Sequence, residues 1–265
     1  MNAQPLARGE NQLLPRALWR VLLRTYRMLQ ALVSKLEQRG PLSAEERRVI
    51  KAAVVRVRDV NADEDIVREG ECPSESSLML EGFSARYKIL SNGRRQITAL
   101  HVLGDFVDLH SFLLKKMDHG VVALTPCRIG VVPHDELRAI TDRYPNLTRL
   151  LWLNTLIDGA IHREWLVAMG RRSALGHTAH LICELFLRLE AVGRTQANSM
   201  NLPITQAELG DTLGISTVHV NRVVQELRSQ GLITWRGEKL TIDNWDGLRE
   251  AAEFDPTYIH LGRQF

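Results

Sequence analysis

A set of side chains able to recognise DNA bases lies at helical spacing near the C-terminus: Thr217, Val218, Asn221, Arg222 and Gln225. Arginine can donate two hydrogen bonds to guanine, asparagine or glutamine can pair with adenine, and a methyl group can pack on that of thymine. Each residue alone would be interpreted as an exposed side chain. Together on one helix face they predict base reading in a major groove, provided that neighbouring elements present that face to a duplex.

Two glycines just upstream predict the element that presents this face. Gly210 supplies the small residue needed where one helix crosses the next, and Gly214 tolerates positive φ in the turn between them. Ser216 is a favourable N-cap for the second helix. A helix-turn-helix with a recognition helix at about 216–229 is therefore predicted, since an ordinary helical hairpin would not need both glycines at these offsets. Its shared apolar face is expected to contain Leu209, Leu213, Ile215, Val220 and Val223.

Contacts with the phosphate backbone are predicted for side chains that flank the base-reading face. Two short β-runs on either side of Arg236-Gly-Glu238 predict a hairpin, the wing of a winged helix. Phosphate contact and simple solvation are equally favoured for the basic residues of this wing. The full set of predicted phosphate contacts is Thr205, Gln206, Ser216, His219, Arg236 and Lys239.

A long helix is predicted before this unit, because apolar residues recur every three or four positions from Leu147 to Met169. About 24 helical residues span ~36 Å, more than one small β-domain covers. Pairing with the same helix of a second copy is therefore expected, although Gly159 and Glu164 weaken a strict heptad, and packing within one chain is the alternative. The expected dimer interface is Leu147, Leu150, Asn154, Ile157, Ile161, Trp165 and Ala168.

Short β-branched runs separated by turn signals fill the middle of the chain, and Asn92-Gly93 between two of them predicts a hairpin.

The predicted fold class is α+β: an N-terminal β-roll (a cupin-like jelly roll), a long dimerisation helix and a C-terminal winged helix-turn-helix. The expected divisions are a basic helical extension (1–41), the β-roll sensor domain (42–134), the long helix (135–171), the DNA-binding domain (172–247) and a C-terminal tail (248–265).

Composition favours an intracellular binding protein. Three cysteines at distant positions make no disulfide framework, and no apolar run approaches a membrane span or a signal peptide, so a cytoplasmic location without a membrane partner is expected. The net charge of +3 is only mildly basic. Arginines at 16, 20, 24 and 27 could bind an acidic partner or form a solvated helix face, which is favoured. An enzyme is not expected, since neither a His-x-His pair, a Ser/His/Asp set nor a Gly-rich phosphate loop is present.

The order of these units, with Val67-Arg-Glu-Gly70, Leu80-Glu-Gly-Phe83, Gly104-Asp-Phe-Val107 and the block from Ile204 to Ile233, resembles the Crp/Fnr regulator superfamily. The resemblance covers about residues 42–250. It implies a homodimer that binds a pseudo-palindromic promoter site and contacts RNA polymerase. A ligand-binding β-roll whose DNA-binding half has lost its function is the alternative. Arg222 matches the family's guanine-reading arginine, whereas Val218 stands where many members have glutamate, so the target sequence is not transferred.

The effector determinants of the best-known members are missing. The resemblance places an effector pocket around Gly104, Asp105, Asp108, Leu109 and His119, where cyclic-AMP-binding members have a glutamate for the ribose and an arginine for the phosphate. A leucine cannot accept that hydrogen bond, and an added aspartate would repel a phosphate. The cysteine cluster of the iron–sulfur members is also absent before Cys72. No cofactor is therefore expected, and a regulator that acts without an effector is favoured, although an unknown small effector stays open.

Two further sensing chemistries are weaker alternatives. His101, His110 and His119 are spaced by nine residues, which is not a standard metal-ligand spacing, so hydrogen-bonded histidines are favoured over a metal or haem site. Cys127 and Cys183 could sense oxidation, but buried inert thiols are favoured.

Overall fold

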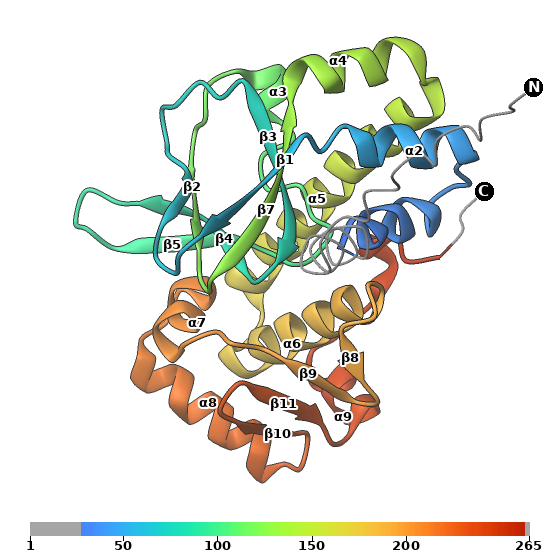
Figure 1. Cartoon of the computed structure of the whole chain (residues 1–265). Helices are drawn as coiled ribbons and strands as arrows, with labels where there is room; N and C mark the ends of the chain where they lie inside the picture. The colour runs from blue at the N-terminus through green and yellow to red at the C-terminus, as the bar shows by residue number, and fades with distance from the viewer. Residues whose placement is uncertain (1–27, 263–265) are drawn as a thin grey trace, which may run out of the picture.

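The protein is described by a computed structural model over residues 28–262 (Figure 1). The arginines predicted to form a basic helical stripe at 16, 20, 24 and 27 lie outside the described residues. A β-roll forms the upper half in Figure 1, a helical domain with a small sheet forms the lower half, and the long helix α5 runs behind both.

The β-roll consists of two antiparallel sheets. One has the order β1-β7-β3, with β1 at Arg56–Val60, β7 at Cys127–Pro133 and β3 at Glu75–Glu81. The other has the order β2-β6-β4-β5, with β2 at Asp65–Val67, β6 at Gly120–Ala123, β4 at Ser84–Ile89 and β5 at Arg95–His101. Met79, Val121 and Ile129 are fully buried between them. The hairpin predicted at Asn92-Gly93 joins β4 to β5, and Gly93 adopts a φ of 78° there.

Helices cover one end and one side of the roll. A helix over residues 28–37 and α2 (Ala44–Ala52) precede the strands. Ser43 and Glu46 form the reciprocal capping box at the start of α2. The short helix α3 (Ser111–Leu114) lies between β5 and β6, and α4 (His134–Arg143) follows β7. The helix over residues 28–37 buries Met28, Leu32, Val33 and Leu36 against the rest of the protein.

The long helix α5 spans Pro145–Arg171, with Pro145 in its first turn, where proline is tolerated. Six of the seven side chains expected to face a second copy are buried within one chain: Leu147, Leu150, Ile157, Ile161, Trp165 and Ala168. The seventh, Asn154, accepts a hydrogen bond from Arg39 Nη1 at 2.7 Å. This corrects the expectation that these side chains are free to meet a second copy, because the periodic apolar face covers the protein's own core.

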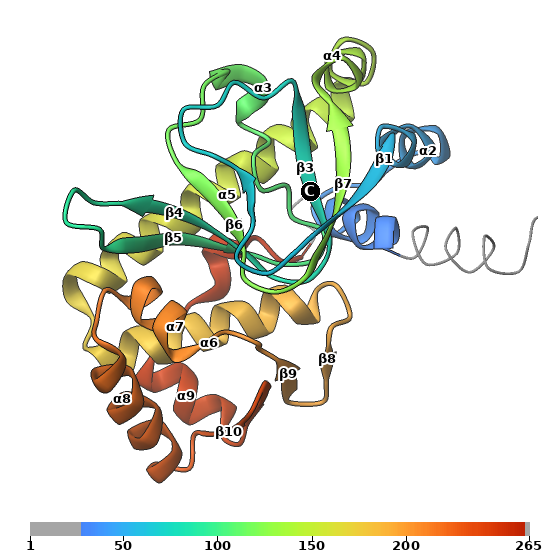
Figure 2. The same ribbon diagram turned by 60° about the vertical axis from the view of Figure 1, so that its left-hand side comes forward.

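The C-terminal domain is built around α6 (Ala174–Glu190), which is buried along most of its length. A four-stranded sheet with the order β10-β11-β9-β8 packs beside it, formed by β8 (Thr195–Gln196), β9 (Ser199–Asn201), β10 (Ile233–Arg236) and β11 (Lys239–Ile242). The helices α7 (Gln206–Leu213) and α8 (Thr217–Ser229) lie between these strands in sequence. Figure 2 shows α7 directly below the β4–β5 hairpin and α8 farther from the roll.

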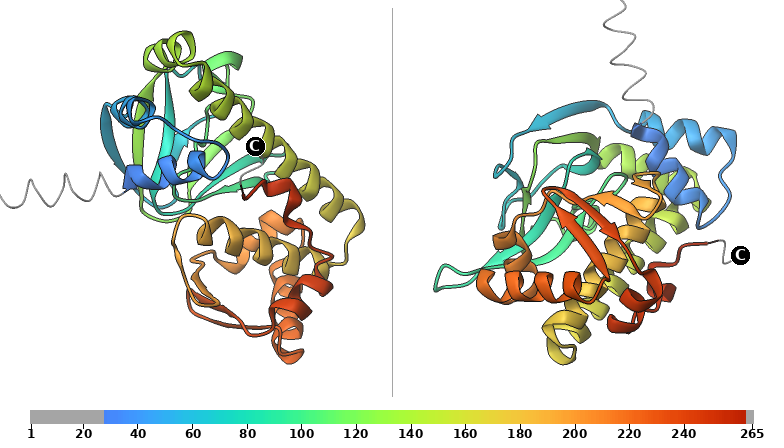
Figure 3. Two further views of the ribbon diagram at one scale, coloured as in Figure 1. Left: turned by 90° about the vertical axis from the view of Figure 1, so that its right-hand side faces the viewer. Right: turned by 90° about the horizontal axis from the view of Figure 1, so that it is seen from below.

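The segment expected as a tail returns to the core. The helix α9 (Trp245–Ala251) and the 3-10 helix η1 (Pro256–Ile259) bury Leu248, Phe254 and Ile259. Figure 3 (left) shows this segment running from the lower domain back toward α5. Among the described helices, none combines the length and apolar character needed to cross a membrane.

Candidate nucleic-acid interface and the joint behind it

The turn between α7 and α8 has the geometry that the two glycines predict. Gly214 ends α7 with a φ of 71°, a left-handed conformation that glycine adopts at no steric cost. A Cβ atom on Gly210 would lie 2.8 Å from the carbonyl oxygen of Ile215, so a side chain there would separate the helices. Val220, Val223 and Leu227 of α8 are buried, which fixes the face that α8 turns outward. The chain therefore forms the predicted helix-turn-helix.

All five predicted base-reading residues lie on the exposed face of α8: Thr217, Val218, Asn221, Arg222 and Gln225. The exposed fraction of Val218 is 64%, high for an aliphatic side chain in a folded domain. Within the described part of the chain, Thr217, Asn221 and Arg222 make no side-chain hydrogen bond or ion pair. Their polar atoms therefore remain available to a ligand that this face meets.

The predicted phosphate contacts surround this face, but two of them already serve as helix caps. The Ser216 hydroxyl accepts from the His219 backbone N–H at 3.3 Å, at the start of α8. The Thr205 hydroxyl donates to Glu208 Oε2 at 2.7 Å in a capping box at the start of α7. The Thr205 proton is therefore engaged, whereas Gln206 and His219 are exposed.

The predicted wing is formed by β10 and β11. Arg236 and Lys239 face each other across the hairpin, and both side chains are exposed. Gly237 takes a φ of 58° in the turn between them. The recognition helix and the wing strands lie together at the end of the molecule farthest from the roll (Figure 1), so both can approach one ligand surface.

The β4–β5 hairpin of the β-roll contacts the helix-turn-helix directly through hydrogen bonds and an ion pair. Arg95 Nε donates to Asp211 Oδ2 at 2.8 Å, and Gln96 Nε2 donates to the Asp211 backbone carbonyl at 2.8 Å. That carbonyl belongs to the last turn of α7, where helical carbonyl groups lack intrahelical partners and carry partial negative charge. The roll therefore satisfies the carboxyl end of the helix that supports the recognition helix.

A buried ionic cluster joins the two halves behind the interface. The Asp105 carboxylate accepts from the Lys35 ammonium and from Arg188 Nη2, the latter at 3.0 Å. Arg188 also donates to Glu184 Oε1 at 2.9 Å, and Glu184 accepts from Trp165 Nε1 and from the Tyr258 hydroxyl. Burial alone would raise the pKa of Asp105, but Lys35 and Arg188 outweigh burial and hold it well below its usual range.

The five residues predicted to surround an effector do not form one open pocket. Asp105 is used in the ionic cluster, and Gly104 packs against the backbone at Ala31 and Leu32, 3.4–3.5 Å from its ideal Cβ position. Asp108 accepts from the Ser77 backbone N–H at 2.5 Å, and burial raises its pKa to about 7. Of the five, only Asp105 and Leu109 line the cavity between the roll and α5, whose volume is about 40 Å³.

Sequence reasoning missed several residues where the roll, α5 and α6 meet. The cavity is also lined by the cations Lys35, Arg39, Arg86 and Arg188 and by the carboxylate Asp158. Arg86 donates to Asp158 Oδ2 at 3.1 Å, which connects β4 to α5. One signal was present in the sequence: Glu184 and Arg188 stand four positions apart in an otherwise apolar stretch of α6, the spacing at which opposite charges on a helix can pair.

The fold and the exposed α8 face together define a DNA-binding regulator that carries a β-roll. Two family models match the chain: a cyclic nucleotide-binding domain over residues 57–144 and a Crp-like helix-turn-helix domain over residues 178–251. The chain belongs to the Crp/Fnr family of DNA-binding transcriptional regulators.

Three relatives support this assignment. The chain is 29% identical to a probable transcriptional activator of Rhizobium leguminosarum bv. viciae, over 73% of this chain and 79% of that protein. It is 24% identical to the transcriptional activator protein FnrL of Cereibacter sphaeroides, over 70% of this chain and 75% of that protein. Among solved structures, FixK2 from Bradyrhizobium japonicum is similar with a TM-score of 0.68 and 25% identity, over 74% of this chain and 96% of that one.

Proposed function

We propose that the protein is a homodimer that reads a pseudo-palindromic promoter site with the exposed face of α8. The observation that carries the proposal is the unpartnered set Thr217, Asn221 and Arg222 on a recognition helix whose opposite side is buried. Val218 and Gln225 complete the base-reading set. Two copies related by a two-fold axis would place two such helices in successive major grooves, about 34 Å apart.

An exposed seam on α5 supports dimerisation. Trp152, Leu156, Gly159, Arg163 and Leu166 follow one another at alternating steps of four and three residues, the spacing of a coiled-coil seam. The exposed fractions of Trp152, Leu156 and Leu166 are 66%, 53% and 73%. A row of large apolar side chains in water is unfavourable, since burial of each such side chain stabilises by about 1.5–3 kcal/mol. This seam therefore replaces the interface expected from the sequence.

The oligomeric state can be tested with Leu156→Asp. A charge at the centre of the seam would be present on both helices of the pair, so we expect at least tenfold weaker self-association in sedimentation equilibrium. The matched control is Leu113→Asp, because Leu113 is also a highly exposed leucine but lies on α3. Unchanged self-association of Leu156→Asp, or a monomeric wild-type protein at micromolar concentration, would contradict the proposed seam.

We further propose that the protein does not bind cyclic AMP by the family's usual mode. Small-molecule pockets in proteins typically enclose about 300–1,000 Å³, whereas the cavity between roll and α5 has about 40 Å³. Leu109 cannot accept a hydrogen bond from ribose, and the buried Asp108 is unfavourable for a neighbouring phosphate. The helix over residues 28–37 packs on Gly104, one of the residues expected to surround an effector. Micromolar binding of cyclic AMP in calorimetry would contradict this proposal.

The DNA-binding surface can be tested with selected duplexes. Sites enriched from random DNA should be palindromic, and Arg222→Ala should lower affinity by about 5–150-fold, equivalent to about 1–3 kcal/mol for one lost base contact. Arg138→Ala is the control, because Arg138 is an exposed arginine on α4, far from α8. Changes at Arg236 or Lys239 should instead reduce the salt dependence of binding, as expected for phosphate contacts.

Two broader expectations follow from promoter binding. The protein would act in the cytoplasm, where promoter DNA is found in bacteria, and would contact RNA polymerase through a surface that DNA leaves free. Equal affinity of the wild-type protein and Arg222→Ala for every duplex would favour the alternative, a β-roll module with a vestigial DNA-binding half.

A further inference from the structure

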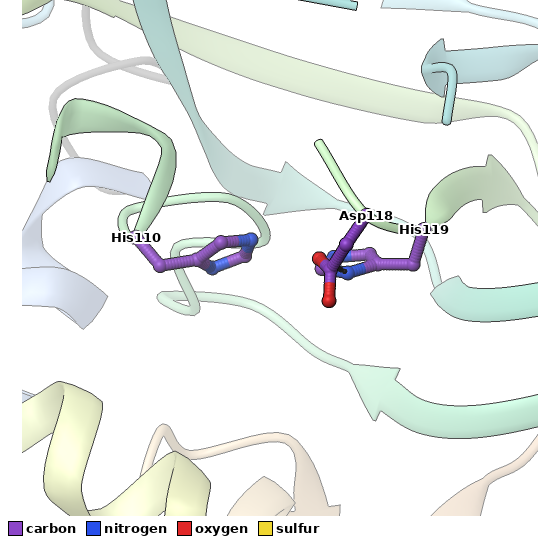
Figure 4. Close-up of side chains that lie close together, drawn as sticks. All are labelled: His110, Asp118 and His119. Atoms are coloured by element: carbon purple, nitrogen blue, oxygen red, sulfur yellow. Dashed lines mark hydrogen bonds and ion pairs between the residues drawn. The ribbon is translucent and has the colours of Figure 1, made fainter. Parts of the chain in front are cut away.

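Two histidines of the β-roll lie side by side with their rings tilted by 43°. His110 precedes α3 and His119 precedes β6, and their ring centroids are 4.9 Å apart. Figure 4 shows both rings converging with the Asp118 carboxylate beside His119. One nitrogen of each ring and one carboxylate oxygen all lie within 4.8 Å of one another. His101 does not take part, since its Nδ1 lies 3.3 Å from the Ser84 hydroxyl.

Both imidazoles carry a buried nitrogen that the protein does not satisfy. His110 Nε2 and His119 Nε2 are shielded from solvent and have no hydrogen-bond partner among the described residues. A buried polar atom without a partner costs about 1–3 kcal/mol. Two such atoms on adjacent rings leave a position at which a ligand would satisfy both.

The donor set and its surroundings suit a metal cation. Imidazole nitrogens with a carboxylate favour zinc and related divalent transition metals. His119 Nδ1 lies 2.6 Å from Asp118 Oδ1, the contact that commonly orients a metal-binding imidazole from its other nitrogen. The nearby Arg86 cation is paired with Asp158, so Asp118 leaves a net negative charge around the two rings.

We propose that His110 and His119 bind one divalent transition metal ion of the zinc class, while the Asp118 carboxylate orients the His119 ring through Nδ1. Zinc bonds of about 2.0–2.1 Å in a tetrahedron separate ligand atoms by about 3.3 Å. The observed separations of up to 4.8 Å therefore need to shrink by at most ~1.5 Å. His110 is only partly buried and Asp118 is exposed, so both side chains have room to move. Water completes the coordination.

The test measures metal binding without DNA, so its outcome is independent of the proposed promoter function. An untagged protein carrying Cys72→Ser removes the exposed thiol as a competing ligand. Titration with Co²⁺ should produce visible d–d absorption at one equivalent, and calorimetry with Zn²⁺ should give one site of micromolar affinity or tighter. His110→Gln and His119→Gln should each weaken binding at least tenfold, and Asp118→Asn by about 10–100-fold if its carboxylate orients His119.

The control is His134→Gln, a partly buried histidine of the same roll that bonds to Ser76 and Ser111 instead. It should bind metal like the parent protein, and circular dichroism should confirm that every variant retains its secondary structure. The proposal is overturned if the parent protein binds neither ion below about 1 mM. It is equally overturned if the double variant His110→Gln/His119→Gln binds as tightly as the parent, or if the His134 variant loses binding to the same extent.

Discussion

Replacing Asp105 with asparagine removes the central charge of the buried cluster and changes little else in its shape. The native cluster contains the cations Lys35, Arg39 and Arg188 and the anions Asp105 and Glu184. In Asp105→Asn, one anion remains among three cations in a largely buried site. Removal of one partner of a buried ion pair typically costs about 3–5 kcal/mol, because the other partner stays buried without its countercharge.

The expected loss is large enough to measure by denaturation. For a protein of this size, 1 kcal/mol corresponds to about 2–4 °C in Tm, so Asp105→Asn should lower Tm by roughly 6–20 °C at pH 7.5. Urea denaturation should give the same free-energy difference. Asp135→Asn is the control, since Asp135 forms an exposed ion pair with Arg138 and its loss should change Tm little.

A second substitution tests whether the unbalanced charge causes the loss of stability in Asp105→Asn. Lys35→Met removes a cation from the same site, so Asp105→Asn combined with Lys35→Met should be more stable than Asp105→Asn alone. The reasoning is refuted if Asp105→Asn costs less than about 1 kcal/mol, or if the double variant is no more stable than the single one. Either result would mean that charge balance does not hold the two halves together.

Two further predictions concern stability. Gly210→Ala should destabilise by about 1–3 kcal/mol in urea denaturation, because its Cβ would lie 2.8 Å from a backbone oxygen, whereas Gly170→Ala has no atom within 4 Å and should not; equal effects would contradict the helix-crossing role. Burial lowers the pKa of His101 and of His180 to about 3, so the unfolded chain binds more protons and stability should fall as pH decreases from about 6.5, by up to ~1.4 kcal/mol per pH unit for each histidine. Asp108, whose pKa burial raises to about 7, opposes one of these two contributions below pH 7. Melting temperatures from pH 7.5 to 4.5 measure the net slope, and replacement of His180 by phenylalanine should flatten it; an unchanged slope would count against this assignment.

The helix-turn-helix could be predicted from the sequence because its constraints are local. Gly210, Gly214 and Ser216 lie within seven positions of one another, and each satisfies a steric or capping need of its immediate neighbours. The hairpin at Asn92-Gly93 is confirmed for the same reason. The fold class and the family are also confirmed.

The inner face of α5 could not be assigned in the same way. Both faces of this helix are apolar, with Leu150 and Ile157 on one and Trp152 and Leu156 on the other. Periodicity shows that a helix buries a stripe, but it does not show whether the covering surface belongs to the same chain or to a second one. That choice depends on how the roll and α6 pack, which is a property of the whole fold.

The partners of Asp105 could not be predicted from the sequence either. The resemblance placed this residue beside an effector, whereas it pairs with Lys35 and Arg188, which are 70 and 83 positions away in sequence. The pairing of His110 with His119 likewise depends on the loops that precede α3 and β6. The sequence disfavours a metal or haem site made of His101, His110 and His119, whereas the structure brings His110 and His119 together without His101.

The cluster around Asp105 also has a consequence for the order of folding. It requires the helix over residues 28–37, the turn after β5, α6 and η1 to meet at one place, and Tyr258 reaches Glu184 across 74 positions. Contacts between such distant segments form slowly, because the intervening loops must close first. The roll and the C-terminal domain are therefore expected to acquire structure separately, and their docking, with the charges leaving water together, is expected to be the slowest step of refolding.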